Sequence, residues 1–517
     1  MFRSLQYHKR AACDVLFGML SEGSWTESGG FMHIAFAASE CVPFAKTGGL
    51  ADVVGSLPQE LAKIGHKVTV YLPRYRLTKL DNPRRVIRSI TVPFDDRYRF
   101  CSVLDGGERN GVQFYFIDYP PFFDRDALYG TPLGDYHDNA ERFALFCRAV
   151  LEATKILGKP DLFHCHDWQT ALIPILLKTL YREDPGLAQT PCVFTIHNLG
   201  YQGLFPPEVL PLLMLPWDLF TMGRLEFYGK VNFLKGAISD ADYITTVSKK
   251  YAQEIQTAEY GFGLEGVLRA RTGTLTGILN GVDYSEWNPV TDAMIAANYS
   301  KDDLSGKAKC KQDLLKEFGI ASETQLPIVG IVSRFAGQKG FDLIQQVADR
   351  MAREDIIAIV LGTGDREYED MFRRLNKQYP QKFAIKIEFN NRLAHKIEAG
   401  ADLFLMPSRY EPAGLNQLYS LKYGTVPIVR ATGGLDDTIE QYDPATGKGT
   451  GFKFREYSGE ALLDTVKSAI TAFRDTQKWQ NLMRNGMSQD YSWAASAREY
   501  GKVYERVKQG RPTPITS

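Results

Sequence analysis

The tetrapeptide Thr-Gly-Gly-Leu occurs twice in the sequence, at residues 47–50 and again at residues 432–435. Adjacent glycines allow backbone N–H groups to approach a ligand closely, and the free N–H groups at a helix start favour negative charge. Lys46 directly precedes the first copy and supplies a cation for a phosphate. These features predict a sugar nucleotide bound between two nucleotide-binding halves. A tight turn with a solvated lysine is the alternative.

Neither glycine pair belongs to a standard nucleotide motif. The spacing around Lys46 is not that of a P-loop, and no G-x-G-x-x-G fingerprint stands in its place. We therefore expect neither nucleotide hydrolysis nor dinucleotide redox chemistry.

Two series of short β-branched and aromatic runs must position these turns. The first series comprises residues 33–38, 68–72, 112–118, 162–166, 193–197 and 243–247. The second comprises residues 327–332, 356–361, 385–389, 403–406 and 426–429. Because longer amphipathic stretches separate these runs, the pattern predicts mainly parallel sheets covered by helices. Such sheets bind ligands beyond the carboxyl ends of their strands, so useful residues are expected there.

The two series divide the chain into two α/β lobes. We expect the first lobe to span residues 32–275 and the second to span residues 276–492, with a hinge near Thr276. Residues 493–517 contain a final helical stretch that we expect to cross back to the first lobe. Residues 1–31 mix charges with a short apolar piece, which argues against a signal or transit peptide. We expect them to be a non-essential extension.

The charge balance argues against nucleic acid and anionic membranes as partners of the protein. Lys+Arg and Asp+Glu each number 61, so there is no overall basic field for nucleic acid or an anionic membrane. The seven cysteines are dispersed and lack metal-finger spacing, which favours reduced thiols. No apolar run is long enough to span a bilayer. We expect a soluble cytoplasmic protein that binds neither nucleic acid nor membrane, and the oligomeric state stays open.

Nine short peptides, taken in order, indicate which family the sequence resembles. They are SE (39–40), KTGGLAD (46–52), HCHDW (164–168), TIHNL (195–199), LNGVD (279–283), SRF (333–335), QKG (338–340), PSRYEP (407–412) and ATGGLDD (431–437). In this order they resemble bacterial glycogen synthases and plant starch synthases, and the resemblance covers essentially everything after Met32. It implies an α/β fold of GT-B architecture, with two Rossmann-like lobes facing across a deep cleft. It also implies glucosyl transfer from ADP-glucose to the non-reducing end of an α-1,4-glucan, with retention of configuration.

The implied reaction leaves a diphosphate whose growing negative charge must be stabilised, and fixed cations in a dry cleft do this well. Arg334 and Lys339 follow the predicted strand 327–332, and a turn can direct both at one phosphate group. Similar residues in the family contact the diphosphate. Because two cations are available, we expect no metal ion and no other cofactor. A solvated Arg–Lys pair on a surface loop is the alternative.

Two further residues are predicted to be catalytic. His197 ends the predicted strand 193–197, and resembling enzymes use it with Asn198 around the transferred glucose. We expect His197 to contact the glucosyl ring rather than to act as a general base. Glu411 can bind sugar hydroxyls or stabilise a partly cationic anomeric carbon, and a helix cap is the alternative. The sequence does not decide between a covalent glucosyl-enzyme and reaction on the leaving-group face.

The resemblance also implies two sets of binding residues. The donor set combines the glycine turns, an aromatic side chain placed for the adenine base, and backbone N–H groups after Glu411. Its members are Lys46, Gly48, Gly49, Phe389, Ala413, Gly414, Leu415, Thr432 and Gly433. The acceptor set lies around the first glycine turn and the histidine-rich strand. Its members are Glu40, Asp52, His166, Asp167 and Asn198.

Some of these residues have simpler explanations. For Glu40 or Asp52, capping of the helix that starts near Leu50 is an equal alternative. The peptide 164–167 resembles a metal site, but no matching second group of ligands stands out, so we expect His164 to be structural.

Two other functions compete with the main prediction. One is a transferase resembling sucrose synthase that uses a small acceptor. The other is a catalytically silent glucan-binding protein, which the presence of Lys46, Arg334, Lys339 and Glu411 disfavours.

Overall fold

The computed structural model describes residues 30–94, 97–131, 133–321 and 324–510. Most of the expected N-terminal extension, residues 1–29, therefore lies outside the described residues. From Met32 onward the chain forms one compact unit. Among the described residues, no helix combines the length and the apolar character needed to cross a membrane.

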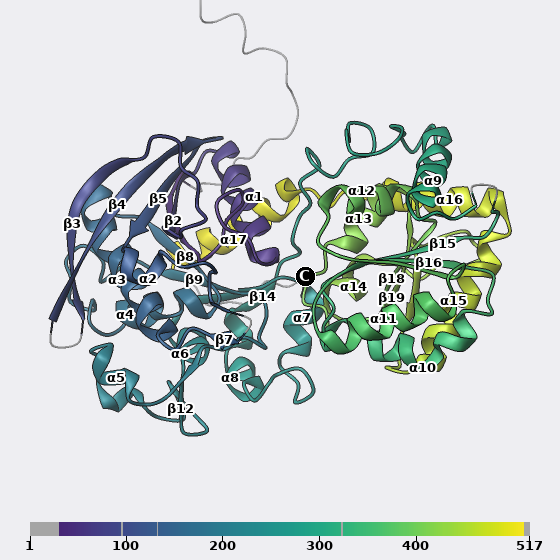
Figure 1. Ribbon diagram of the computed structural model, residues 1–517. Coiled ribbons are helices and arrows are strands. Elements are labelled where there is room, and N and C mark those ends of the chain that lie inside the picture. The colour runs from purple at the N-terminus through teal and green to yellow at the C-terminus, as the bar shows by residue number, and fades with distance from the viewer. Residues whose placement is uncertain (1–29, 95–96, 132, 322–323, 511–517) are drawn as a thin grey trace, which may run out of the picture. The chain divides into compact units, whose positions relative to one another are not determined.

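The first sheet is mainly parallel. In spatial order its described strands are β14 (Leu275–Gly277), β13 (Tyr243–Thr246), β9 (Cys192–Ile196), β8 (Leu162–His166), β1 (His33–Ala37), β2 (Lys67–Pro73), β5 (Val112–Asp118), β4 (Arg97–Arg109) and β3 (Arg84–Phe94) (Figure 1). The strands from β14 to β5 pair in parallel, whereas β4 and β3 extend the edge as an antiparallel hairpin. The order of the parallel strands reverses between β1 and β8, which is a topological switch point.

All six strands predicted for the first series are present, but the β3–β4 hairpin was missed. One face of β3 is exposed, so its sequence alternates between polar and apolar residues. Strands buried on both faces are instead marked by continuous apolar runs, and β3 has no such run.

The second sheet has the Rossmann strand order. Its described strands, again in spatial order, are β17 (Phe383–Ile387), β16 (Ile357–Gly362), β15 (Ile328–Val332), β18 (Leu403–Met406), β19 (Val426–Arg430) and β20 (Phe452–Phe454). All pair in parallel, and the switch point lies between β15 and β18. The five strands predicted for the second series are confirmed. The expected α/β fold of two Rossmann-like lobes is therefore correct.

Helices cover both faces of each sheet (Figure 1). Those of the first lobe are α1 (Gly49–Lys63), α2 (Pro120–Phe123), α3 (Asn139–Leu157), α4 (Leu172–Leu177), α5 (Val209–Leu212), α6 (Phe233–Asp240), α7 (Lys249–Glu254) and α8 (Glu265–Ala270). Those that follow are α9 (Ser305–Glu317), α10 (Phe341–Met351), α11 (Arg366–Gln378), α12 (Asn391–Gly400), α13 (Asn416–Lys422), α14 (Gly433–Thr438), α15 (Gly459–Phe473), α16 (Thr476–Met487) and α17 (Trp493–Lys508). Short pairings add β10 (Leu204–Phe205), β11 (Glu226–Phe227) and β12 (Lys230–Asn232), and β6 (Gly130–Thr131) with β7 (Gly134–Asp135).

Side chains alternate between two cores on either side of each sheet. In β1, Ala35 and Ala37 face the core that contains α3 and α4, whereas Ile34 and Phe36 face the core that contains α1. This alternation buries both faces of the sheet, as parallel strands require.

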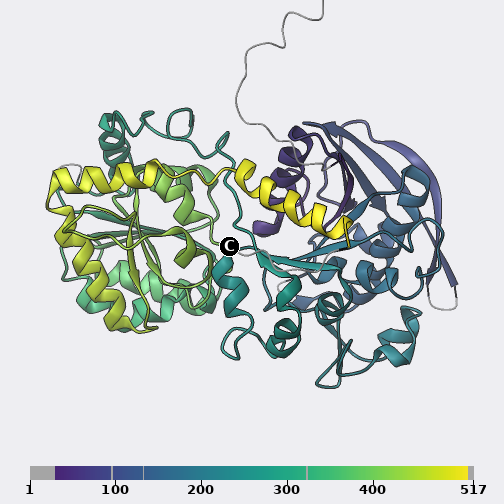
Figure 2. The same ribbon diagram turned by 180° about the vertical axis from the view of Figure 1, so that it is seen from behind.

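The last helix, α17, follows the second lobe in the chain but packs on the first lobe beside α1 (Figure 2). Trp493, Tyr500 and Tyr504 are buried in the same core as Phe36. The chain passes between the lobes twice, and the two passages touch at a bridge between Val282 and Ser492.

Candidate functional site

The candidate residues lie beyond the carboxyl ends of the strands that flank the two switch points. In the first lobe, Glu40 follows β1, and Asp167 directly follows β8. In the second lobe, Arg334 follows β15, and Glu411 follows β18. Because the connections on the two sides of a switch point run in opposite directions, they leave room for a ligand between them. The sequence placed these residues at the correct edges.

An ion pair lies at the switch point of the second lobe. Lys339 Nζ is 3.0 Å from Oε1 and 2.7 Å from Oε2 of Glu411. Ser408 Oγ donates a further hydrogen bond of 2.9 Å to Glu411 Oε2. The Glu411 side chain is 8% exposed and that of Lys339 is 22% exposed, so the lysine is the more accessible member of this pair. These hydrogen bonds fix and orient the carboxylate.

Gly340 allows the lysine turn to approach the glutamate loop. Its φ is 74°, in the left-handed region. A Cβ atom at this position would lie 2.0 Å from the carbonyl oxygen of Pro407. Glycine is therefore required where the turn that carries Lys339 meets the loop that carries Glu411.

Arg334 points toward the first lobe. Its side chain is exposed, and Nη2 donates a hydrogen bond of 3.2 Å to the hydroxyl of Tyr201. This bond raises the pKa of the guanidinium. The structure thus directs Lys339 and Arg334 to different partners, one within the second lobe and one across to the first.

The first-lobe side of the site is built on a strained residue. Asp167 has a φ of 54°, which is unusual for a residue other than glycine. This conformation lets its Oδ1 accept a 2.7 Å hydrogen bond from the backbone N–H of His197. Burial raises the pKa of Asp167 to about 7, although hydrogen bonds from the backbone of His197 and Asn198 favour the carboxylate. Burial lowers the pKa of His197 to about 3, so this imidazole is neutral at ordinary pH.

His166, a member of the predicted acceptor set, has the surroundings of a core residue. Its side chain is fully buried, and its Nδ1 lies 3.0 Å from Nε2 of His197. The ring stacks on Phe36 at 5.5 Å. The direction of the strand explains this, because the side chain of the last residue of β8 still points into the core while the chain turns at Asp167. His166 therefore contacts His197 rather than solvent.

His164 is structural, as expected. Both of its ring nitrogens have partners, with Nε2 2.6 Å from Thr195 Oγ1 and Nδ1 2.8 Å from the hydroxyl of Tyr504 in α17. Within the described parts of the chain, no group of three or more His, Cys, Asp or Glu side chains is arranged to hold a metal ion.

The first glycine turn is open. Cβ atoms at Gly48 and Gly49 would have no neighbour within 4 Å. The buried carboxylate of Glu40 supports the turn from below, since it accepts hydrogen bonds from the backbone N–H groups of Thr47 and Gly48. Glu40 therefore holds the two residues that directly precede α1.

The cation beside this turn is already paired. Lys46 Nζ lies 2.6 Å from Asp52 Oδ1, and the Lys46 side chain is 51% exposed. An exposed pair of this kind contributes little to stability, so Lys46 is free to exchange Asp52 for another anion.

At the second glycine turn, another part of the protein binds the polar groups that a ligand would need. The backbone N–H of Gly433 and the hydroxyl of Thr432 both donate to the carboxylate of Glu254, which belongs to α7 of the first lobe. A Cβ atom at Gly434 would lie 1.9 Å from the carbonyl oxygen of Ala413. The glycines here allow close packing of backbone on backbone, whereas the predicted role was close approach to a ligand.

The remaining donor candidates differ in their surroundings. Phe389 lies after β17 rather than in it, and its ring is 89% exposed. Ala413, Gly414 and Leu415 precede α13 and are partly exposed. Among the described residues, no hydrogen-bond partner is seen for their three backbone N–H groups.

Sequence reasoning missed Tyr201, Ser408 and Glu254. Signals existed for the first two, since Tyr201 lies in the loop that begins at His197, and Ser408 lies within the peptide 407–412. Glu254 is 179 residues from Gly433, and nothing local marks the contact.

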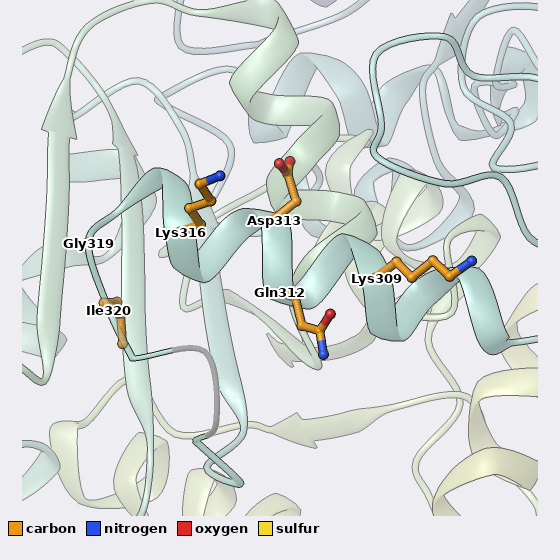
Figure 3. Close-up of a pocket in the computed structure, with 6 residues that line it drawn as sticks. All are labelled: Lys309, Gln312, Asp313, Lys316, Gly319 and Ile320. Carbon is orange, nitrogen blue, oxygen red and sulfur yellow. The ribbon is translucent and has the colours of Figure 1, made fainter.

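A separate pocket lies on the surface of the second lobe, along α9 (Figure 3). It is lined by Lys309, Gln312, Asp313, Lys316, Gly319 and Ile320. None of the candidate residues contributes to it.

Comparison with known proteins gives consistent matches over nearly the whole chain. The family model for the starch synthase catalytic domain matches residues 33–270, and that for glycosyl transferases group 1 matches residues 315–485. A glycogen synthase of Koribacter versatilis is 71% identical over 485 residues, covering 94% of this chain and 100% of that protein. A glycogen synthase of Pseudothermotoga lettingae is 47% identical over 485 residues, covering 92% and 99%.

Solved structures give matches consistent with these sequence relatives. The catalytic domain of starch synthase IV from Arabidopsis thaliana, bound to ADP and acarbose, superposes with a TM-score of 0.85 at 34% identity, and the match covers 93% of this chain and 100% of that one. A sucrose-phosphate synthase from Thermosynechococcus elongatus has a TM-score of 0.56 at 16% identity over 92% and 98% of the two chains, which is a likeness of fold alone.

Proposed function

This chain belongs to the family of bacterial glycogen synthases and plant starch synthases, which are glycosyltransferases, and we propose that it transfers glucose from ADP-glucose to the non-reducing end of an α-1,4-glucan with retention of configuration. The ADP and acarbose in the starch synthase IV structure support a nucleotide-sugar donor and a glucan acceptor.

The observation that carries the proposal is the Lys339–Glu411 ion pair beside Arg334 at the second switch point. When the bond from the anomeric carbon to the diphosphate breaks, its electron pair moves to a phosphate oxygen. Lys339 supplies a compact positive charge and Arg334 a planar fork of donors, and both stabilise this developing charge. Glu411 lies against Lys339 and provides negative charge for the partly cationic anomeric carbon.

The first glycine turn is proposed to bind the diphosphate from the other side. The open space over Gly48 and Gly49 admits a phosphate to the start of α1, and Lys46 can exchange Asp52 for it. Glu40 holds the turn in shape. Asp52, once released, is available to hydroxyls of the acceptor.

The sugar rings are proposed to lie against the loops that follow β8 and β9. Neutral His197 can donate or accept a hydrogen bond at the transferred glucose. Asp167 and Asn198 bind hydroxyls of the glucan. His166 acts through His197, whose ring it orients from within the core.

The nucleoside is proposed to lie on the second lobe. The exposed ring of Phe389 is available to stack on adenine, and the backbone N–H groups of residues 413–415 are available to donor hydroxyls. A contact of the donor with Thr432 or Gly433 requires that Glu254 give way.

Arg334 and Lys339 are two cations available to stabilise the leaving group, so we expect turnover without a metal or any other cofactor. The proposed organisation is a first lobe of residues 32–275, a second of residues 276–492 and a returning helix from residue 493. We also propose a cytoplasmic location and no partnership with nucleic acid or membrane, as the balanced charge suggests.

An incorporation assay tests the proposal. Labelled ADP-glucose or UDP-glucose is supplied with glycogen or with fructose, with and without EDTA, and label is measured in the acceptor. We expect incorporation from ADP-glucose that EDTA does not reduce. Label transferred to fructose but not to glycogen would favour a small acceptor, and no transfer at all would favour a silent glucan-binding protein.

A further inference from the structure

Tyr201 reaches from the first lobe to the cation of the second. Its hydroxyl accepts the 3.2 Å hydrogen bond from Nη2 of Arg334, and its ring is 51% exposed. The residue has no role in the function proposed above. Its contact joins two residues that lie 133 positions apart in the sequence.

The loop that carries Tyr201 is rigidly held. The side chain of Asn198 accepts a 3.0 Å hydrogen bond from the N–H of Gly200, and the backbone N–H of Tyr201 donates to the carbonyl of Asn198 at 3.2 Å. The buried hydroxyl of Tyr251 accepts a 3.0 Å bond from the N–H of Leu199. Because this loop begins at His197, the glucose contact and the Arg334 contact belong to one fixed segment.

The segment of the second lobe that faces this loop, around Tyr410, is also held in place. The Tyr410 ring packs edge-on against Phe262 of the first lobe at 5.5 Å. Gln338, in the turn that carries Lys339, donates a 3.2 Å hydrogen bond to the carbonyl of Tyr410. A Cβ atom on Gly200 would lie 3.3 Å from the Tyr410 hydroxyl, so the two segments approach closely beside Tyr201.

We propose that Tyr201 is a positioning residue that holds the guanidinium of Arg334 toward the donor diphosphate. This rests on the function proposed above. An exposed arginine side chain samples many rotamers, and an acceptor that fixes one of them reduces the entropy lost when phosphate binds. The hydroxyl engages one of the five N–H donors of the guanidinium, so the others stay available to phosphate oxygens.

The variant Tyr201→Phe tests this role because it keeps the ring and removes only the acceptor. We expect about a tenfold loss in kcat/KM for ADP-glucose, since hydrogen bonds to charged groups are among the stronger ones. The KM for glycogen and the Tm should not change. Tyr228→Phe is the matched control, because Tyr228 is 85% exposed in the same lobe, and it should behave as wild type.

A double-mutant cycle distinguishes positioning from a structural effect. In an Arg334→Lys background, Tyr201→Phe should cost less than about twofold, because the guanidinium that it positions is gone. An equal loss in both backgrounds, or no loss in the single variant, would overturn the proposal.

Binding of ADP, measured by calorimetry, gives an answer that does not depend on turnover. We expect Tyr201→Phe to weaken ADP binding by about fivefold relative to Tyr228→Phe, and to have no such effect in Arg334→Lys. Unchanged ADP affinity would overturn the role of Tyr201. If the wild-type protein bound ADP in this manner but incorporated no glucose, the proposed function would fail while the role of Tyr201 would stand.

Discussion

Replacing Lys339 with alanine should lower both stability and turnover, and the two losses can be separated through Glu411. The substitution leaves a carboxylate with 8% exposure and one remaining side-chain partner, Ser408. Removing one member of a buried pair costs about 3–5 kcal/mol. Because the lysine end of this pair is 22% exposed, water can reach the vacated space, and we expect about 2–3 kcal/mol. In a lobe of this size that corresponds to a fall in Tm of roughly 4–12 °C.

The double variant Lys339→Ala with Glu411→Gln removes the unpaired charge. An uncharged amide needs no counter-ion, so most of the lost stability should return, to within about 1 kcal/mol of Glu411→Gln alone. Turnover should not return, because the cation that stabilises the leaving group is still missing. We expect at least about a 100-fold loss of kcat in both variants that lack Lys339.

The assays are thermal unfolding and incorporation of labelled ADP-glucose into glycogen. Lys309→Ala is the control, because this exposed lysine lines the separate pocket on α9 and should leave both measurements unchanged. A double variant as unstable as Lys339→Ala would refute the idea that an unpaired Glu411 is the cause. Unchanged kcat in Lys339→Ala would remove this lysine from the catalytic residues.

Three further predictions concern Asp167, the two glycine turns and the N-terminal segment. Because the pKa of Asp167 is raised to about 7 and the ionised carboxylate is the stronger acceptor, we expect kcat/KM for glycogen to rise with pH through this value. The variant Asp167→Asn should abolish the inflection. The folded state binds this proton more tightly than the unfolded chain, so the free energy of unfolding should fall as the pH rises from about 4 to about 7. Urea titrations of Asp167→Asn should find a shallower fall. Gly48→Ala should keep the Tm and weaken ADP binding, whereas Gly434→Ala should lower the Tm by many degrees, because its Cβ would lie 1.9 Å from the Ala413 oxygen; equal Tm values would contradict this difference. Deletion of residues 1–31 should leave incorporation unchanged, and lost activity in a folded protein would reject their dispensability.

Strands that are buried on both faces were the elements best predicted from the sequence. A strand such as β18, buried on both faces, reads as a continuous apolar run, and the loop after it carries Glu411 as expected. The hairpin β3–β4 was missed because one of its faces is exposed. Among the site residues, those that follow strands directly were placed at the correct edge. His166, the last residue of β8, was assigned to the acceptor set, and its side chain points into the core.

Contacts between distant segments were not predictable from local patterns. Nothing near Arg334 in the sequence indicates that its partner is a tyrosine 133 residues earlier. The same holds for Glu254, whose burial raises its pKa and whose carboxylate binds the start of α14. Local propensity fixes where a turn occurs, but the packing of another lobe decides which of its polar groups remain available to a ligand.

The two Thr-Gly-Gly-Leu peptides illustrate this division most clearly. Both peptides lead into a helix, α1 from Gly49 and α14 from Gly433, although Gly433 has a φ of 45° and Gly48 is extended. In the second copy, Glu254 occupies the amide of Gly433, and Asp437 accepts a hydrogen bond from the backbone of Lys250 in the same helix of the first lobe. The second turn thus joins the lobes near their connection, where a phosphate would compete with a buried carboxylate. The first turn, with open space over its glycines and an exchangeable cation, is the one suited to the diphosphate, and it lies on the lobe opposite Arg334 and Lys339. If the first turn binds the diphosphate as proposed, charge stabilisation at the leaving group depends on both lobes at once. Residues that fix the approach of one lobe to the other are then expected to affect turnover without touching the substrate.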